Sequence, residues 1–135
     1  MRDLDVVIVS YNTQADLVAC LASLHSQPPA NLREVFVVDN ASSDGSVSEI
    51  RTRWPTVEMI ALDRNVGFAA ANNIAIRRSS ASLVLLLNSD TVVPAGAIDT
   101  LVDRLNTTGA VAAGPRLVDR QGRPEISFGP MLSPW

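Results

Sequence analysis

Leu4-Asp-Val-Val-Ile-Val-Ser-Tyr-Asn12 is a valine-rich apolar run, interrupted only by Asp5, that ends in polar residues. A continuous apolar run of this kind is typical of a strand buried on both faces, as the strands of parallel sheets are. The same pattern, an apolar run that ends in polar residues, recurs in Leu83-Val-Leu-Leu-Leu-Asn-Ser-Asp90, whose apolar part is not interrupted. The two stretches therefore predict a parallel sheet whose strands end in polar side chains.

Strand and helix patterns alternate through the rest of the chain. We expect further strands over residues 35–38 and 57–62, and helices from Thr13 to the Pro28-Pro29 pair, over 46–54, over 68–78, and from about Pro94 to 105. Residues 111–118 and 125–128 flank a turn-like stretch, 119–123, and predict a C-terminal β-hairpin. This order predicts an α/β fold, with a mostly parallel, Rossmann-like sheet flanked by helices, in a single domain over residues 1–135.

The first predicted helix carries a local cap and an apolar face. Thr13 is placed to cap its first turn, with Asp16 as a weaker capping partner. Four of its side chains recur at helical spacing and are expected to face the core: Leu17, Cys20, Leu21 and Leu24.

Composition excludes several classes of protein. A net charge of -3 argues against nucleic-acid binding, which needs a clustered basic face. All 11 basic residues are arginine, so any site that needs a lysine is excluded. The single cysteine excludes an internal disulfide and fits a reducing compartment.

No apolar run reaches the roughly 20 residues that span a bilayer. We expect a cytoplasmic protein, with peripheral attachment to the inner face of the membrane and a homo-oligomer left open.

Polar residues gather at the predicted carboxyl ends of three strands. In open α/β sheets, ligands bind beyond these ends, so the clusters are expected to converge on one crevice. The glycine-rich fingerprint of dinucleotide-binding folds is absent after the first strand. A diphosphate can instead be held through a divalent cation, which needs a hard oxygen ligand. Asp90, directly after an apolar strand and a short turn, is placed to supply one.

Four motifs carry a family resemblance: Val6-Val-Ile-Val-Ser-Tyr-Asn12, Val37-Val-Asp-Asn-Ala-Ser-Ser-Asp-Gly-Ser46, Asn65-Val-Gly-Phe-Ala-Ala-Ala-Asn-Asn73 and Leu86-Leu-Asn-Ser-Asp90. In this order and spacing they resemble family 2 glycosyltransferases of the GT-A fold. Within that family the chain is most similar to the bacterial rhamnosyltransferase-like branch of cell-surface polysaccharide synthesis. The resemblance covers nearly the whole chain, and implies the donor-binding half of an inverting glycosyltransferase that acts on a saccharide or lipid-linked acceptor.

The resemblance also implies roles for individual positions. Asp39 would accept a hydrogen bond from the nucleobase, and Asp90 would coordinate Mg²⁺ or Mn²⁺ between the two phosphates of a UDP- or dTDP-linked sugar. The remaining positions implied to bind the nucleotide are Ser10, Tyr11, Asn12, Asn40, Ser42, Asp44, Asn65, Gly67, Asn73, Asn88 and Ser89.

Two departures from the family pattern bear on activity. The first position of the metal motif is Asn88 rather than aspartate, which leaves Asp90 as the strong metal ligand. The family's catalytic base is a carboxylate farther downstream, and no residue here matches it, so the domain is expected to be truncated before the acceptor-binding part. A non-catalytic nucleotide-binding module therefore stays open as an alternative. A flavodoxin-like receiver domain is a third reading, against which the missing lysine argues.

Overall fold

The structure is a computed structural model that describes residues 2–119 and 121–125. Its elements, in chain order, are β1 (Leu4–Ser10), α1 (Gln14–Ser26), β2 (Leu32–Asp39), α2 (Ser46–Arg53), β3 (Glu58–Ala61), α3 (Phe68–Ile76), β4 (Leu83–Asn88) and α4 (Ala97–Thr108). The chain divides into two compact units, Met1–Ala97 and Ile98–Trp135. The first unit contains the sheet, and α4 belongs almost wholly to the second.

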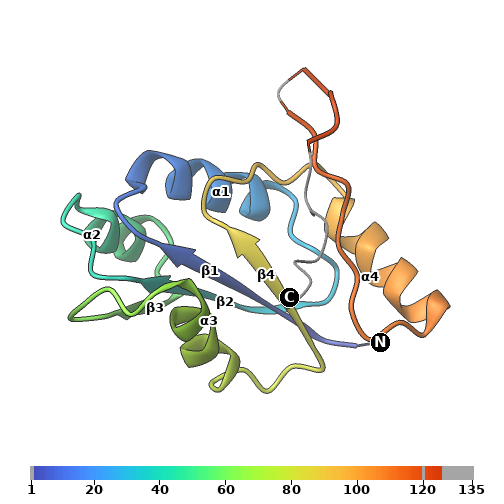
Figure 1. Ribbon diagram of the computed structural model, residues 1–135, viewed down its shortest axis with the longest axis horizontal. Coiled ribbons are helices and arrows are strands. Elements are labelled where there is room, and N and C mark those ends of the chain that lie inside the picture. The colour runs from blue at the N-terminus through green and yellow to red at the C-terminus, as the bar shows by residue number, and fades with distance from the viewer. Residues whose placement is uncertain (1, 120, 126–135) are drawn as a thin grey trace, which may run out of the picture. The chain divides into compact units, whose positions relative to one another are not determined.

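The described strands form one parallel sheet in the order β3-β2-β1-β4 (Figure 1). β1 lies inside the sheet, with Ile8 in register with Val37 of β2 and with Leu87 of β4. All of β1 is buried, which explains why its sequence is apolar except at Asp5 and at its last residue, Ser10. The predicted α/β fold, with a parallel sheet flanked by helices, is confirmed.

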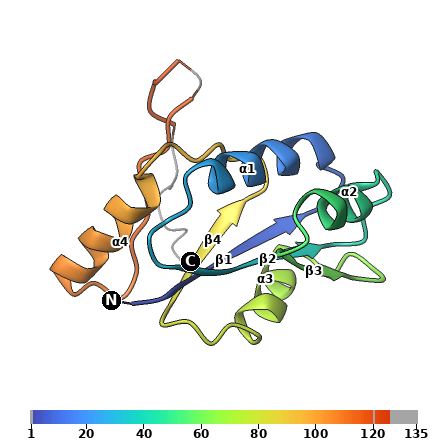
Figure 2. The same cartoon turned by 180° about the vertical axis from the view of Figure 1, so that it is seen from behind.

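Helices cover both faces of the sheet. α1 and α2 lie on one side and α3 on the other, as both views show (Figures 1 and 2). The α3 face is an apolar cluster in which Ala71 and Ala75 pack with Val7, Phe36 and other strand residues. Alanine at these positions lets the helix come close to the strands. On α1, the residues predicted to face the core are all fully buried: Leu17, Cys20, Leu21 and Leu24.

β4 differs from the other long strands in its burial, and it lies at an edge of the sheet. Its residues alternate between half-buried and exposed, with Val84 36% and Leu86 49% exposed. Because successive side chains of a strand point to opposite faces, the exposed residues share one face, which is left open. The most apolar run of the chain is therefore not its most buried strand, and composition alone does not report this.

The C-terminal hairpin is only partly present. Residues 111–118 do not form the predicted strand, and one isolated antiparallel bridge joins Val118 to Pro124. Asp119 closes the turn between them, because its backbone N–H donates to the carbonyl of Arg123 at 2.9 Å and its carboxylate accepts from the N–H of Gln121. Val111 is fully exposed, so this stretch lacks the buried face that stabilises a strand. Residues 126–128 of the predicted second strand lie outside the described residues.

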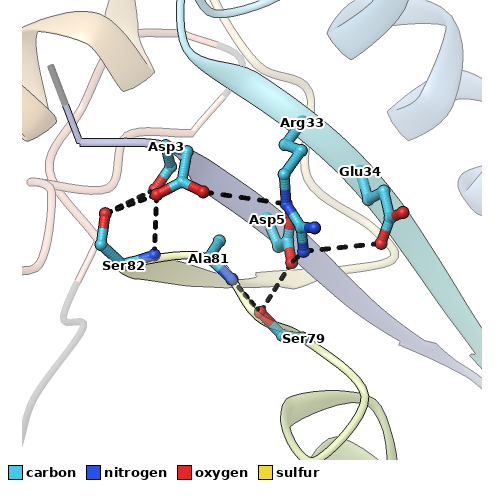
Figure 3. A network of polar contacts seen from close by, with 7 residues as sticks. All are labelled: Asp3, Asp5, Arg33, Glu34, Ser79, Ala81 and Ser82. Carbon is cyan, nitrogen blue, oxygen red and sulfur yellow. Dashed lines mark hydrogen bonds and ion pairs between the residues drawn. The ribbon is translucent and has the colours of Figure 1, made fainter.

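A polar network lies at the amino ends of the strands, at the end of the sheet opposite their carboxyl ends (Figure 3). The carboxylate of Asp5 on β1 is fully buried, and the guanidinium of Arg33 on β2 donates to it through Nε at 3.0 Å. Ser79 Oγ donates to the same carboxylate at 2.6 Å, and Asp3 accepts from the N–H of Ser82 at 2.9 Å. The network explains why an acidic residue can interrupt the apolar run of β1.

Among residues 2–119 and 121–125, no helix combines the length and the apolar character that a bilayer-spanning segment requires.

Candidate functional site

A pocket of ≈ 400 Å³ lies at the carboxyl edge of the sheet within the first unit. It is lined by Val9, Tyr11, Thr13, Asp16, Asn40, Asn65, Phe68, Asn88, Ser89 and Asp90. The residues among these that the sequence predicted for the site are Tyr11, Asn40, Asn65, Asn88, Ser89 and Asp90. The carboxyl ends of β1, β2 and β4 and the start of α3 therefore contribute to one pocket, as the convergence of the polar clusters required.

Hydroxyl groups connect the ends of β1 and β4 at the wall of this pocket. Thr13 Oγ1 lies 3.0 Å from Ser10 Oγ and 3.2 Å from Ser89 Oγ. Thr13 is the N-cap residue of α1, as predicted, but within the described residues its side chain does not cap the helix. The predicted capping interaction is therefore wrong, because the hydroxyl is engaged by two strand ends instead.

Asp44 takes over the role of cap for two helices. Its Oδ2 accepts the backbone N–H of Gln14, in the first turn of α1, at 2.8 Å, and its Oδ1 accepts the N–H of Ser46 at 3.0 Å. Burial opposes the negative charge of Asp44, but the hydrogen bonds from Ser46 and Gln14 outweigh it and lower the pKa of the carboxyl. Asp44 is not among the residues that line the pocket, so it holds the pocket's framework.

Asn12 joins the loops that follow β1 and β2. Its backbone N–H donates to Ser42 Oγ at 2.8 Å, and its Oδ1 accepts the N–H of Ser43 at 2.9 Å. Asn12 and Ala41 both have positive φ, at 52° and 68°. For residues with a Cβ this backbone conformation is unfavourable, and it is kept where the surrounding contacts impose it. The two loops at the pocket edge are therefore fixed in one shape.

Asp39 ends β2 and is 1% exposed. Its Oδ2 accepts the N–H of Ser42 at 2.8 Å. Its Oδ1 is buried and accepts no hydrogen bond from any residue that the structure describes. A buried acceptor without a donor costs about 1–3 kcal/mol, so such atoms are uncommon away from functional sites.

The loop between β3 and α3 is fastened to the end of β2. Asn40 Oδ1 accepts the N–H of Val66 at 2.8 Å, and Asn65 Oδ1 accepts the N–H of Gly67 at 2.9 Å. Gly67 has φ 86° and ψ 161°, which a residue with a side chain rarely adopts. These contacts fix where α3 starts. Asn73, one helical turn on, is exposed and does not line the pocket.

Cys20 responds to the charge at the end of β4. Burial raises the pKa of its thiol to about 11, and the nearby Asp90 carboxylate contributes in the same direction. The thiol also donates to the carbonyl of Asn88 at 3.6 Å. Asp90 is itself exposed and lines the pocket.

The oxygen atoms around Asp90 suit a hard divalent cation in type but not in number. Asp90 and Asp16 bring carboxylates to the pocket lining, and Ser89 and Asn88 bring neutral oxygens. In the described part of the chain, no three His, Cys, Asp or Glu side chains gather closely enough to hold a metal unaided. Mg²⁺ is usually held by one or two carboxylates together with substrate phosphates, which fits this set.

Four pocket residues were not predicted as site residues: Val9, Thr13, Asp16 and Phe68. The sequence predicts Thr13 and Asp16 as helix caps and Val9 as part of a buried strand. It predicts Phe68, which is 57% exposed, as a helix residue within the third family motif and gives it no role in the site. The available signal was position, because each of these residues lies at the carboxyl end of a strand or in the first turn of the helix that follows one.

The model of the family described as "Glycosyl transferase family 2" matches residues 5–130 of the chain. The chain belongs to glycosyl transferase family 2. The predicted family is thus confirmed, and the four-stranded parallel sheet is the core of a GT-A-like fold.

Two curated relatives are N-acetylglucosaminyltransferases. The one from Bradyrhizobium diazoefficiens is 35% identical over 119 residues, which make up 84% of this chain and 24% of the relative. The one from Bradyrhizobium elkanii is 34% identical over 123 residues, 87% of this chain and 68% of the relative. The chain thus spans about a quarter of the first relative. Neither name supports the predicted similarity to the rhamnosyltransferase-like branch, which stays a prediction.

A solved structure with the same architecture is the mannosyltransferase PcManGT from Pyrobaculum calidifontis in complex with GDP-Man and Mn²⁺. It aligns with a TM-score of 0.66 at 27% identity, over 78% of this chain and 34% of that one. That protein binds a nucleoside-diphosphate sugar and a divalent cation together.

Proposed function

We propose that this family 2 domain binds a nucleoside-diphosphate sugar, UDP- or dTDP-linked, with Mg²⁺ or Mn²⁺, for inverting transfer to a saccharide or lipid-linked acceptor. The observation that carries the proposal is the buried Oδ1 of Asp39, an acceptor without a donor at the carboxyl end of β2. The imide N–H of uracil or thymine is a donor of the matching kind. Asp39 does not itself line the pocket, whereas Asn40, the next residue, does, so the proposal requires the Asp39 side chain to turn toward a bound base.

The chemistry of the pocket lining supports the same ligand. Tyr11 is 51% exposed and lines the pocket, so it offers an aromatic face to a base. Asn40 and Asn65 provide amide groups that could hydrogen-bond polar atoms of the nucleotide. Ser89 and Asp90 lie at the end of β4, where the diphosphate would meet the cation.

The residues that would hold the divalent cation are Asp90 and, through its neutral oxygen, Asn88. When bound, the cation supplies positive charge that stabilises the departing nucleoside diphosphate. A hydrogen bond between Thr13 Oγ1 and Ser89 Oγ holds Ser89 in place beside Asp90. The neighbouring Asp16 adds negative charge to the lining and favours a cation there.

The transfer itself needs a base within hydrogen-bond reach of the acceptor hydroxyl. No residue of this sequence matches the family's base. Turnover, the acceptor and the inverting outcome are therefore proposed for a protein of the relatives' full length and not for these 135 residues alone. A non-catalytic nucleotide-binding module is the second candidate function. It rests on the pocket alone, which could bind a nucleotide whether or not transfer follows.

Two sources point to different donor sugars. The names of the relatives favour N-acetylglucosamine, whereas the resemblance to the rhamnosyltransferase-like branch points to rhamnose. A cytoplasmic location, with the inner face of the membrane as the alternative, is proposed because activated sugars of this kind are made in the cytoplasm.

Calorimetric titration tests the proposal. UDP, dTDP, UDP-N-acetylglucosamine and dTDP-rhamnose are titrated into the chain with and without Mn²⁺, beside the Asp90→Ala variant. We expect metal-dependent binding that the variant loses. Absence of binding by the folded wild-type chain under all of these conditions would refute the proposal. Transfer to a saccharide acceptor would exclude the non-catalytic alternative.

A further inference from the structure

Phe68 is an unusual residue for the position it occupies. It is the first residue of α3 and 57% exposed, although a phenylalanine on a helix that packs against a sheet is expected to face the core. The core-facing positions of α3 are taken by Ala71 and Ala75. The aromatic ring lines the pocket instead.

Phe68 is held in this position by the backbone around it. Gly67, with φ 86° and ψ 161°, turns the chain directly before it. The preceding residue, Val66, donates its N–H to Asn40 at the end of β2. The carbonyl of Phe68 accepts a hydrogen bond from Asn72 Nδ2 at 3.0 Å, and Asn72 is itself 4% exposed. The exposed ring therefore projects from a fixed site rather than from a loose loop.

The pocket lining divides by chemistry. Val9, Tyr11 and Phe68 are its apolar or aromatic members, and the remaining residues carry hydroxyl, amide or carboxylate groups. In a nucleoside-diphosphate sugar the base is the one planar aromatic part, whereas the phosphates are charged and the sugars offer smaller C–H faces between hydroxyl groups. The base is therefore the part of this ligand with the largest stacking surface for an aromatic ring.

The location of Phe68 agrees with this assignment. The loop that precedes it is bonded to Asn40, and the backbone N–H of Leu62, where the same loop begins, donates to the carbonyl of Asp39 at 2.9 Å. Asp39 carries the unpartnered oxygen proposed above to meet the base. Phe68 is therefore attached to the base end of the pocket through these contacts, and Asp90 belongs to the diphosphate end.

We infer that Phe68, together with Tyr11, forms the aromatic surface on which the nucleobase of the donor stacks. The inference rests on the proposed donor-binding function and adds a residue that positions the base. Stacking uses the face that all bases share, so Phe68 contributes affinity, whereas hydrogen bonding at Asp39 selects bases that carry an imide N–H, uracil and thymine, over those that do not. The preference for bases with an imide N–H is expected to survive changes at Phe68.

The test compares a ligand that has a base with one that lacks it. UDP and inorganic pyrophosphate, each with Mn²⁺, are titrated into the wild-type chain and into Phe68→Ala, Phe68→Leu and Phe68→Tyr. Alanine is expected to weaken UDP binding by about tenfold, the order that base–aromatic stacking contributes, and to leave pyrophosphate binding unchanged. Tyrosine is expected to restore UDP binding, and leucine to restore only part of it.

Ile76→Ala is the matched control, because Ile76 is an apolar residue of the same helix that is 37% exposed and does not line the pocket. It should leave both affinities unchanged. Unchanged UDP affinity in Phe68→Ala, or an equal loss for UDP and pyrophosphate, overturns the inference. If dTDP is the nucleotide that the wild-type chain binds, it replaces UDP in the test. Failure of the wild-type chain to bind either nucleotide refutes the proposed function itself, so the two failures are distinguishable. Phe68→Leu keeps the test valid if the alanine variant does not fold.

Discussion

Arg33 on β2 and Asp5 on β1 form a two-pronged ion pair, with Nε donating to Oδ1 at 3.0 Å and a second guanidinium nitrogen bound to Oδ2. The partners differ in burial, because the side chain of Asp5 is 0% exposed and that of Arg33 is 34% exposed. Removing the arginine would leave a charge inside the protein, whereas removing the aspartate would leave a charge that water can reach. The pair should therefore respond unequally to the two substitutions.

We predict that Arg33→Met destabilises the chain more than Asp5→Val does. The single loss of Arg33 leaves Asp5 with Ser79 as its remaining donor shown at that carboxylate, and we expect its melting temperature to fall by about 10 °C. The double variant should recover much of this loss, since no buried charge remains. Thermal unfolding followed by circular dichroism gives the three values. Additive effects of the two single substitutions would contradict the prediction.

The sequence predicted the sheet because its strands are apolar runs that end in polar residues, a signal that is local. It did not reveal that β4 lies at an edge with Leu86 exposed, because strand order is not written in any one segment. The strand expected over 111–118 was wrong for the same reason. A run containing Val111 looks like a strand, but only a partner with a buried face would make it one.

The site was predictable where side chains follow strands directly, as Asp90 and Asn40 do. It was not predictable where a distant side chain takes over a local role, as Asp44 does when it caps α1 in place of Thr13. Thr13 looked like a cap, yet its hydroxyl contacts Ser89, which lies 76 positions away in the sequence. Phe68 was missed because the exposure of a helical residue depends on how the helix is rotated against the sheet.

Asp44 should couple stability to pH on the acid side. Hydrogen bonds to its carboxylate lower its pKa in the folded state despite the opposing effect of burial. A folded pKa below the unfolded value of about 3.9 means that the stabilisation is present at higher pH. It is lost as the pH falls through the folded pKa. Asp44→Asn removes the titrating group, so its unfolding free energy should change less between about pH 6 and pH 3 than that of the wild type.

Urea unfolding across this range measures the effect of Asp44. Near neutral pH the variant should be less stable by about 1 kcal/mol, as the loss of a charged helix cap costs. Asp63→Asn, at an exposed loop position, is the control and should keep the acid dependence of the wild type. Parallel curves for wild type and Asp44→Asn would show that the caps contribute nothing to it.

Cys20 should couple stability to pH on the alkaline side. Burial, with a smaller contribution from Asp90, raises the pKa of its thiol to about 11 in the folded chain. Because the folded value exceeds the unfolded one, the stabilisation is complete below the unfolded pKa of about 8.5 and is lost as the pH rises through the folded pKa. Unfolding free energies of wild type and Cys20→Ala should therefore converge between about pH 8 and pH 11.

The alanine variant starts from a lower stability near neutral pH, because truncating a fully buried side chain leaves a cavity. A thiol-specific reagent gives an independent check, since Cys20 is the single cysteine. The thiol should react only as fast as the native chain opens. Rapid labelling under native conditions would show that it is accessible.

Gly67→Ala should destabilise the chain through its backbone rather than through crowding. An added Cβ would meet no heavy atom within 4 Å among the described residues, yet φ at this position is +86°. Forcing a residue with a side chain into such a conformation costs about 1–3 kcal/mol. Gly114→Ala is the matched control, because it too has open space around it and no positive φ. Urea unfolding should separate the two variants, and equal stabilities would refute the backbone explanation.

Asp39→Asn should separate ligand binding from stability. The variant keeps the shape of the side chain, and its remaining oxygen can accept the N–H of Ser42, as Oδ2 does now. At the position of the unpartnered Oδ1 it presents an amide donor, which would face the imide N–H of a bound uracil. UDP affinity in the presence of Mn²⁺ should fall by about tenfold or more, since two donors then oppose each other in a buried place.

The stability of the Asp39→Asn variant should change by less than about 1 kcal/mol, because a desolvated charge is removed together with one charge-assisted hydrogen bond. Calorimetry and urea unfolding of the same preparation give both numbers, with pyrophosphate as the ligand that lacks the imide. Undiminished UDP affinity in a folded variant would mean that Asp39 serves the turn it accepts from and does not contact a base.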